Sequence, residues 1–346
     1  MNNWRQIFSV IRPGCEELDK AFRKWDSLRG GKTTNVDIIW FPKPITNLYD
    51  MREKLKVALE LQIKKEKEEG EAYFIENEVA EELARRGAFT RPATSSEELI
   101  EEYAEEVTPN KPHISSFRMQ NRLFRFLGWT TRRVGYKNQY TVTDLGKQIA
   151  AFSGPFPSTI EQLSERDLVV KSLVSFGVFS VNDNINQWDT RFKQRIVVNL
   201  LRVTAFYGYI SNNELVVTAF ALKDERDPEQ VKEIMHRLQR LHEGEISMID
   251  AFKEVNVDPY DSSAVNNAYD GPKVLLSLCR QVNLLHEKTI PLESSPYGDL
   301  RPIYEKMHKG KSAIKKPRVV NVITDLGRSV LEQELKKTVI WFDELK

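Results

Sequence analysis

Cysteine is scarce in this sequence: Cys15 and Cys279 are the only two among 346 residues. Two thiols cannot build a disulfide framework or the thiolate sites that hold structural zinc. The scarcity therefore excludes a small, disulfide-stapled secreted domain, and it fits a protein that works in a reducing compartment.

Long hydrophobic runs are also missing, since no apolar stretch approaches the roughly 18 residues that a membrane span needs. The first six residues, Met-Asn-Asn-Trp-Arg-Gln, lack the apolar core of a signal peptide. Yet 40% of the residues are hydrophobic and 10% are aromatic, which is enough to bury a substantial core. We expect a soluble, cytoplasmic bacterial protein with no membrane partner.

An excess of charge of one sign is absent too, because 51 basic side chains nearly balance 50 acidic ones and leave a formal charge of +1. The charges are nevertheless segregated along the chain. Two acidic blocks, 64–106 at −8 and 224–261 at −6, each precede a basic block, 110–147 at +7 and 301–328 at +6. The acidic blocks are typical of solvated helical faces, whereas the basic blocks are candidate surfaces for a polyanionic partner.

Recognisable catalytic and metal-binding motifs are lacking as well. Residues 30–33, Gly-Gly-Lys-Thr, resemble the end of a phosphate-binding loop, but Asp26 stands where that loop needs its first glycine. The five histidines lack the spacing of metal ligands, and no Gly-x-Ser-x-Gly motif is present. The tripeptides 334–336 and 344–346 have the Glu-x-Lys form of a nuclease strand, but the first falls in a helical run and the second ends the sequence. We assign this chain no catalytic residue, metal ligand or bound cofactor.

An internal repeat is the clearest positive signal. Tyr-Thr-Val-Thr-Asp-Leu-Gly-Lys at 140–147 returns as Asn-Val-Ile-Thr-Asp-Leu-Gly-Arg at 321–328. Alternating β-branched residues favour the last strand of a hairpin, threonine or aspartate can cap the next helix, and glycine allows close packing at its start. Each copy therefore predicts a hairpin that leads into a helix, which is half of a winged helix.

The segment before the first copy supplies the rest of such a unit. Ser115 and Ser116 are candidate caps for a helix over 117–127, and 129–134 is expected to pair with 139–143 as a hairpin. At about 100° per residue, the apolar side chains of this helix fall on one side. The opposite side of the helix, and then the hairpin, are expected to carry Arg118, Asn121, Arg122 and Arg125, followed by Arg132, Arg133 and Lys137.

The second copy follows a helix predicted over 270–282, with Asp270 as its cap and Pro272 in its first turn. Three of its residues repeat the spacing of the first helix's arginines: Lys273, Ser277 and Arg280. A long insertion separates this helix from the second copy. It predicts a mobile basic loop that contains Lys309, Lys311, Lys315, Lys316 and Arg318.

These side-chain types suit duplex DNA. Arginine can donate two hydrogen bonds to guanine O6 and N7, asparagine can bind adenine, and surplus cations hold phosphates. The lysine-rich loop favours non-specific attraction to phosphate over base reading, because lysine is a flexible point charge. The alternative interpretation of each face is an ordinary solvated basic surface.

The expected fold is mainly α with small β-hairpins, an α+β class, built as tandem winged-helix DNA-binding subdomains joined by a helical linker. Helical periodicity over 165–176, 192–207, 211–222 and 228–243 indicates the linker. The expected division is an N-terminal α/β extension over 1–62 with a strand candidate at 36–41, a first winged-helix subdomain over 63–153, the linker over 154–245, and a second winged-helix subdomain over 246–346.

Three stretches carry a family likeness: Asn3-Trp4 to Trp25, the segment 115–149 with its hairpin exit, and the helix pair of 210–243 followed by 267–285. In these stretches the chain resembles the DNA-recognition half of type IIS restriction and nicking endonucleases of the AlwI-like family. The resemblance implies tandem winged-helix recognition subdomains, with their readers in the first and second helices above. It also implies a separate PD-(D/E)xK nuclease, which is not visible here and is therefore expected on another chain or in a missing region.

The predicted function is sequence-specific recognition of double-stranded DNA, as part or subunit of a type II, IIS-like restriction endonuclease. Two non-identical helices suit a short asymmetric site. The expected partners are duplex DNA, a nuclease subunit that supplies Mg²⁺-dependent cleavage, and a cognate methyltransferase of the same restriction-modification system. The alternative, from a non-enzymatic class, is a plasmid replication initiator or transcriptional regulator built from tandem winged helices.

Overall fold

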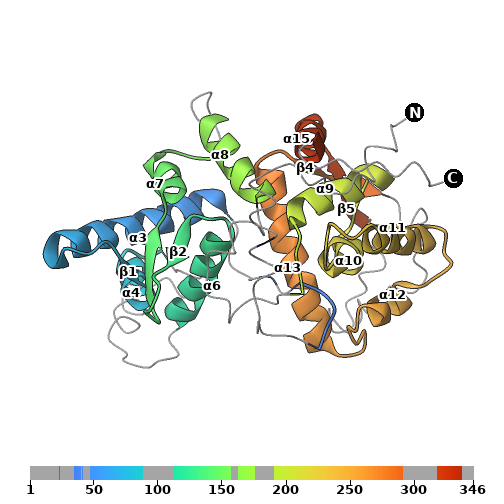
Figure 1. Cartoon of the computed structure of the whole chain (residues 1–346), viewed down its shortest axis with the longest axis horizontal. Coiled ribbons are helices and arrows are strands. Elements are labelled where there is room, and N and C mark those ends of the chain that lie inside the picture. The colour runs from blue at the N-terminus through green and yellow to red at the C-terminus, as the bar shows by residue number, and fades with distance from the viewer. Residues whose placement is uncertain are drawn as a thin grey trace. The chain divides into compact units, whose positions relative to one another are not determined.

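The computed structural model describes residues 23, 35–39, 41, 47–88, 112–156, 163–175, 191–290 and 318–336. The chain divides into two compact units, Pro42–Asn184 and a second that combines Met1–Phe41 with Ile185–Lys346 (Figure 1). Both units are mainly helical with small antiparallel sheets, which confirms the expected α+β class. The finer four-part division stays a prediction. None of the described helices is long and apolar enough to cross a membrane.

The first unit is built around a three-stranded antiparallel sheet with the strand order β1-β3-β2. In chain order its described elements are α3 (Leu48–Glu69), β1 (Phe74–Ile75), α4 (Glu76–Arg85), α6 (Pro112–Phe126), β2 (Thr130–Arg132), β3 (Gln139–Val142), α7 (Asp144–Ala151) and α8 (Leu163–Val174). The expected hairpin is confirmed, with Thr130 opposite Val142. The strand β1 was not foreseen, and it adds to the free edge of β3 with Phe74 opposite Tyr140.

The long helix α3 has clear start and stop signals. The side chain of Asn47 accepts hydrogen bonds from the backbone N–H groups of Tyr49 and Asp50, and Gly70 ends the helix at a φ of 75°. Met51 and Leu55 are fully buried on the face that packs against β3 and α7. This helix therefore forms the back of the sheet.

The helix α6 packs through its apolar side, as the sequence predicts. Phe117, Leu123 and Phe124 are fully buried, and the ring of Phe124 lies 5.6 Å from the ring of Trp129. The helix begins at Pro112, five residues earlier than the expected 117. It packs against α4, which the sequence had presented only as part of an acidic block.

The second unit repeats the hairpin on a larger scale. Its described elements are α9 (Ile196–Tyr207), α10 (Asn212–Val217), the 3₁₀ helix η4 (Ala219–Ala221), α11 (Pro228–His242), α12 (Met248–Glu254), α13 (Ser262–Gln281), β4 (Leu285–Ile290), β5 (Arg318–Ile323) and α15 (Asp325–Lys336). The strands β4 and β5 are antiparallel, and Ile210 bridges to Asn321 of β5 through two backbone hydrogen bonds of 2.8 and 2.7 Å. Ile210 thus occupies the place that β1 has in the first unit.

The start of α13 corrects the sequence interpretation. The helix begins at Ser262, and Asp261 caps it by accepting a hydrogen bond from Ser263 N at 2.8 Å, so Asp270 is not the cap. Pro272 lies inside the helix and removes one backbone hydrogen bond. Buried Val265 and Ala268 anchor the turns before the proline, so the helix continues through it.

The strand expected at 36–41 is also wrong for the residues that the structure describes there, 35–39 and 41. They form a bend. Asp37 N donates to the carbonyl of Val255 at 2.9 Å, and Ile39 N donates to that of Phe220 at 2.8 Å. These two acceptors belong to different segments, so no ladder forms.

The repeated Thr-Asp-Leu-Gly motif makes the same contacts in both units. Thr143 Oγ1 donates to the carbonyls of Gly128 and Trp129 and accepts from Gly146 N at 3.0 Å. Thr324 Oγ1 donates to the carbonyls of Asn283 and Leu284 and accepts from Gly327 N at 2.9 Å. The predicted threonine cap is therefore confirmed in both copies.

Both glycines of the motif have a packing reason. A Cβ at Gly146 would overlap the carbonyl oxygen of Trp129, and a Cβ at Gly327 would overlap that of Leu284. Each helix after the hairpin thus lies against the first residue of its own hairpin. No other residue type fits without a shift of the backbone.

The helices before the two hairpins end in the same way. Gly128 and Asn283 adopt left-handed conformations, with φ of 73° and 61°. The next residues, Trp129 and Leu284, each donate a 2.8 Å backbone hydrogen bond to the carbonyl five positions earlier. The separation of Gly128 from Asn283 equals that of Arg118 from Lys273, so the two helices align residue by residue.

Candidate nucleic-acid interface

The exposed side of α6 is a narrow stripe. Ser115 and Arg118 are exposed, and Met119 and Arg122 are half-buried, at the i, i+3, i+4 and i+7 positions of one helical face. The side chain of Arg118 is 59% exposed. The stripe therefore presents two of the four predicted polar residues, Arg118 and Arg122.

Asn121 does not lie on this stripe, and the prediction that it does is wrong. It is fully buried; its Nδ2 donates to Glu76 Oε1 at 2.7 Å and its Oδ1 accepts from Thr130 Oγ1 at 2.8 Å. On a helical wheel Asn121 is only about 40° from Phe117. The interior face is wider than the apolar residues alone indicate, because this asparagine is part of it.

Arg125 is misplaced by the sequence interpretation as well. Its side chain is buried, and the guanidinium lies over the ring of Tyr140 on β3, 5.3 Å from the centroid. The second unit contains the matching contact, in which Arg280 donates to Asn321 Oδ1 at 3.0 Å. Tyr140 and Asn321 open the two copies of the repeat, so both arginines turn back onto the last strand of their own sheet.

A polar relay joins the interior of the first unit to Arg118. Glu76, the first residue of α4, is buried; its Oε1 accepts from Asn121, and its Oε2 lies 3.8 Å from Arg118 Nε. Thr130 on β2 holds the other end of Asn121. The carboxylate is thereby fixed from within the fold and lies beside the exposed guanidinium of Arg118. Glu76 was not predicted as part of the site, because this residue lies in the acidic block 64–106, far from α6 in the sequence.

The hairpin between β2 and β3 is held by its own arginines. Arg132 donates from Nε to the carbonyl of Tyr136 at 3.3 Å and from Nη2 to that of Lys137. Arg133 pairs with Glu71 at 2.8 Å, and its guanidinium lies 4.4 Å from the ring centroid of Tyr136. The hydrogen bond from Arg133 lowers the pKa of the Glu71 carboxyl below its usual range. Of the three predicted hairpin cations, Lys137 is exposed, whereas Arg132 and Arg133 are half-buried.

The matching face of α13 is far less basic. Lys273 is exposed, but its Nζ lies 3.7 Å from Asp270 and 4.7 Å from the ring centroid of Tyr269. Ser277 is half-buried and accepts a hydrogen bond from Gln281 Nε2 at 3.2 Å. The remaining predicted phosphate contacts lie outside the described side chains: Lys309, Lys311, Lys315, Lys316 and Arg318.

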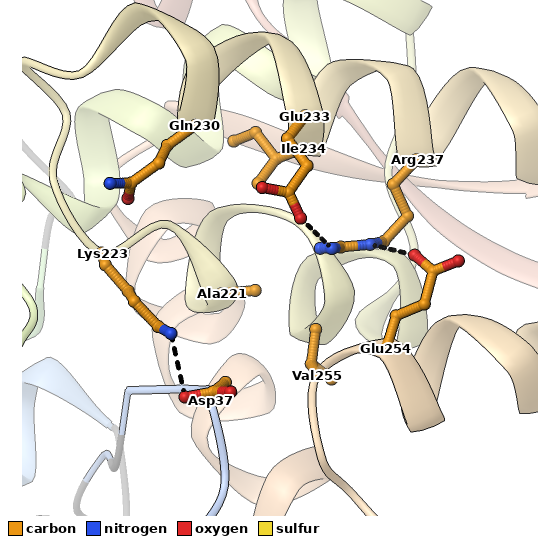
Figure 2. A pocket seen from close by; sticks show the side chains of 9 residues that line it. All are labelled: Asp37, Ala221, Lys223, Gln230, Glu233, Ile234, Arg237, Glu254 and Val255. Carbon is orange, nitrogen blue, oxygen red and sulfur yellow. Dashed lines mark hydrogen bonds and ion pairs between the residues drawn. The ribbon is translucent and has the colours of Figure 1, made fainter.

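A cavity of about 260 Å³ lies in the second unit and is lined by several charged residues (Figure 2). Figure 2 shows Lys223 directed at Asp37 and the guanidinium of Arg237 between Glu233 and Glu254. These pairs measure 3.0 Å for Asp37, 2.7 Å for Glu233 and 2.8 Å for Glu254. Burial alone would raise the pKa of Asp37, but hydrogen bonds from Lys223 and Asn256 outweigh it and lower the pKa.

The carboxylates of this cavity are thus each paired with a cation of the same chain. Across the part of the chain that the structure describes, no group of three histidine, cysteine, aspartate or glutamate side chains is arranged to hold a metal ion. Glu334 of the first Glu-x-Lys tripeptide lies on α15 and pairs with buried Arg195 at 3.1 Å. The second tripeptide, 344–346, and the stretch 30–33 lie outside the described residues.

No protein-family model matches the chain, and no curated protein matches it significantly. Among solved structures, that of restriction endonuclease FokI is similar over 85% of this chain, with 11% sequence identity and a TM-score of 0.38. The match covers 47% of the FokI chain, so this chain spans less than half the length of that protein. A TM-score this low carries no argument about fold or function. Membership of the AlwI-like family stays a prediction.

Proposed function

We propose that this chain recognises a specific sequence of double-stranded DNA through α6 and the adjoining β2–β3 hairpin of its first unit. The observation that carries the proposal is the pair of arginines on the exposed stripe of α6, one of which lies 3.8 Å from a buried carboxylate. Arginine is the side chain best suited to bind guanine in the major groove, and its discrimination depends on a fixed direction.

The element order supports a winged-helix interpretation of both units. In the first unit a helix, a short strand, two helices and a two-stranded hairpin follow one another as α3, β1, α4, α6, β2 and β3. In the second unit α9, the bridging residue Ile210, α10, α13, β4 and β5 follow the same order, with α11 and α12 inserted. In helix-turn-helix proteins the second of the two helices is the one that enters the major groove. That helix is α6 in the first unit.

The proposed roles follow from burial. Arg118 and Arg122 contact base edges, and Lys137 contacts phosphate. Asn121 and Arg125 are not assigned base contacts because their side chains are buried. Arg280 is not assigned one because it pairs with Asn321 and Glu287 of its own unit. Lys273 and Ser277 contribute less, since an aspartate beside Lys273 offsets its charge. The lysines of the 309–316 segment remain proposed phosphate contacts.

The wider assignment is the recognition part or subunit of a type II, IIS-like restriction endonuclease. Mg²⁺-dependent cleavage would come from a nuclease on another domain or chain, and a methyltransferase would protect the host site. The basis for this assignment is the sequence resemblance to AlwI-like enzymes.

Selection from a random-sequence duplex pool tests the proposal. We expect the full chain to enrich one short, asymmetric sequence, and Arg122→Ala to lose the preference while still folding. A Mg²⁺ cleavage assay on the enriched duplex, with and without the product of the adjacent gene, separates the two classes of function. Cutting at a fixed offset only with that partner supports the endonuclease. Binding to direct repeats without cleavage would instead assign a replication initiator or regulator.

A further inference from the structure

The tip of the β2–β3 hairpin exposes an apolar side chain. Val134 is 95% exposed, the most exposed of the large hydrophobic residues that the structure describes, and Tyr136 beside it is 46% exposed. Hairpin tips are usually built from polar residues and glycine. Here Gly135 alone supplies the left-handed turn position, at a φ of 87°. The fold buries almost none of this valine, so its side chain is available to a partner.

The tip is held in one shape. The guanidinium of Arg132 binds the carbonyls of Tyr136 and Lys137, so it closes the loop from one side. Backbone hydrogen bonds from Tyr136 N to the Arg133 carbonyl and from Arg133 N to the Gln139 carbonyl close it further. Arg133 then covers the ring of Tyr136. Val134 is therefore presented on a pre-ordered loop, which lowers the entropy cost of inserting it into a partner.

The charges around the valine identify the chemistry of that partner. Residues 132–138 read Arg-Arg-Val-Gly-Tyr-Lys-Asn, with three cations and no acidic residue. Glu71 pairs with Arg133, so Arg132 and Lys137 keep the tip positive. An apolar side chain surrounded by cations fits the minor groove of duplex DNA, where negative potential is strong and an apolar wedge can separate two stacked base pairs. The groove is about 6 Å wide, which admits a hairpin tip but not a helix.

We propose that Val134 is a wedge that the hairpin inserts into the minor groove, where it unstacks one base step and bends the duplex, with Lys137 on a neighbouring phosphate. This proposal rests on the proposed function, because α6 must first place the unit on duplex DNA. It adds a second mode of recognition, in which sequences that unstack at low cost, such as pyrimidine–purine steps, are preferred at a position that no polar side chain reads.

The test uses the full chain and a duplex enriched from the random pool, with 2-aminopurine placed at successive positions and a donor and acceptor dye at the two ends. Anisotropy reports binding, 2-aminopurine fluorescence reports unstacking, and energy transfer reports bending. For the wild type we expect a several-fold rise in 2-aminopurine fluorescence at one step and a shortened end-to-end distance. Val134→Ser loses both signals and weakens binding only a few-fold, whereas Val134→Leu keeps both.

Val319→Ser is the matched control, since Val319 is 52% exposed on β5 of the other unit. It leaves all three signals unchanged. Binding of the wild type without unstacking, or unstacking that survives in Val134→Ser, overturns the wedge and leaves the proposed function standing. A chain that binds no duplex overturns both. If Val134→Ser instead lowers the molar mass by light scattering and leaves the DNA complex unaltered, the valine serves self-association and the wedge is wrong.

Discussion

The two units share a scaffold and differ in the surface that the scaffold presents. In both, a helix ends at a left-handed residue, a threonine caps the helix after the hairpin, and a glycine lies against the first hairpin residue. On the exposed side of the helix before the hairpin, however, the two units carry different residues. Arg118 and Arg122 of the first unit correspond in the alignment to Lys273 and Ser277 of the second. Backbone geometry is repeated and side-chain chemistry is not, and for this reason we place the proposed base reading in the first unit.

The interiors differ at one informative position. Asn121 of the first unit aligns with Leu276 of the second, and both are buried. A leucine at this position shows that the scaffold folds without an amide. The first unit nevertheless keeps a buried asparagine hydrogen-bonded to Glu76 and Thr130, an arrangement that is sensitive to the loss of any partner. We infer that the relay helps to set the direction of Arg118.

The largest effect is expected where the units are alike. Gly146→Ala and Gly327→Ala each place a methyl group on a backbone carbonyl, and we expect each to destabilise its unit by about 3 kcal/mol in urea unfolding. Gly135→Ala is the matched control, because open space surrounds it and only its positive φ opposes the change, at about 1 kcal/mol. Equal stability of Gly146→Ala and the wild type would show that the two hairpins do not share this packing.

Asn121→Leu gives the first unit the residue of the second. It leaves Glu76 without its hydrogen-bond donor, so we expect a loss of about 2 kcal/mol in unfolding free energy. Discrimination between the enriched duplex and a scrambled one should fall as well, measured by anisotropy. Ser115→Ala, on the exposed stripe, is the control and should change stability by less than about 0.5 kcal/mol. If the Asn121→Leu protein were as stable and as selective as the wild type, the contacts from Asn121 through Glu76 to Arg118 would have no role in recognition.

Glu76→Gln tests the attraction between Glu76 and Arg118 separately from the stability of the fold. The amide oxygen can still accept from Asn121, but the attraction that holds Arg118 is gone. We expect discrimination to fall about fivefold, the equivalent of roughly 1 kcal/mol, with little change in urea unfolding. Glu78→Gln on the same helix removes a carboxylate that pairs with Lys65 and should leave discrimination intact. Loss of discrimination in both variants would point to general electrostatics.

The smallest effect is expected from phosphate contacts. Lys137→Ala, Lys315→Ala and Lys316→Ala should each weaken binding to enriched and scrambled duplexes alike, by a few-fold. The slope of log K against log salt should decrease by about one per lysine, because each phosphate contact releases about one counterion. A lysine whose removal alters the sequence preference would have to be reassigned as a base contact.

The sequence predicts the repeated part of this fold well and its long-range part poorly. The hairpin exit, the threonine cap and the close glycine follow from local chemistry, and the structure confirms them in both units. The two-residue strand β1 and the bridge at Ile210 are too short to produce an alternating pattern, and each pairs with a strand far along the chain. Such pairings depend on tertiary packing between distant segments, which the local sequence pattern does not predict.

In the candidate site, too, local sequence predicts some features and long-range packing decides the others. A helical wheel places Arg118 and Arg122 on the exposed face, but it assigns every polar residue near the boundary to solvent. Asn121 and Arg125 break that assumption because Glu76 and Tyr140, from other elements, provide them with partners in the interior. Glu76 itself could be found only through the fold, since nothing in its local sequence links it to α6.

The central claim is that the first unit supplies most of the discrimination between DNA sequences and the second unit supplies little. It is tested most directly by the ratio of affinities for the enriched and scrambled duplexes, measured for the wild type, Arg118→Ala/Arg122→Ala and Lys273→Ala under one salt condition. We expect the ratio to collapse towards one in the double variant, because an arginine that reads a base contributes about 1 to 3 kcal/mol of discrimination. We expect Lys273→Ala to keep the ratio within about threefold of the wild type. An unchanged ratio in the double variant, or a collapse in Lys273→Ala, would contradict the claim.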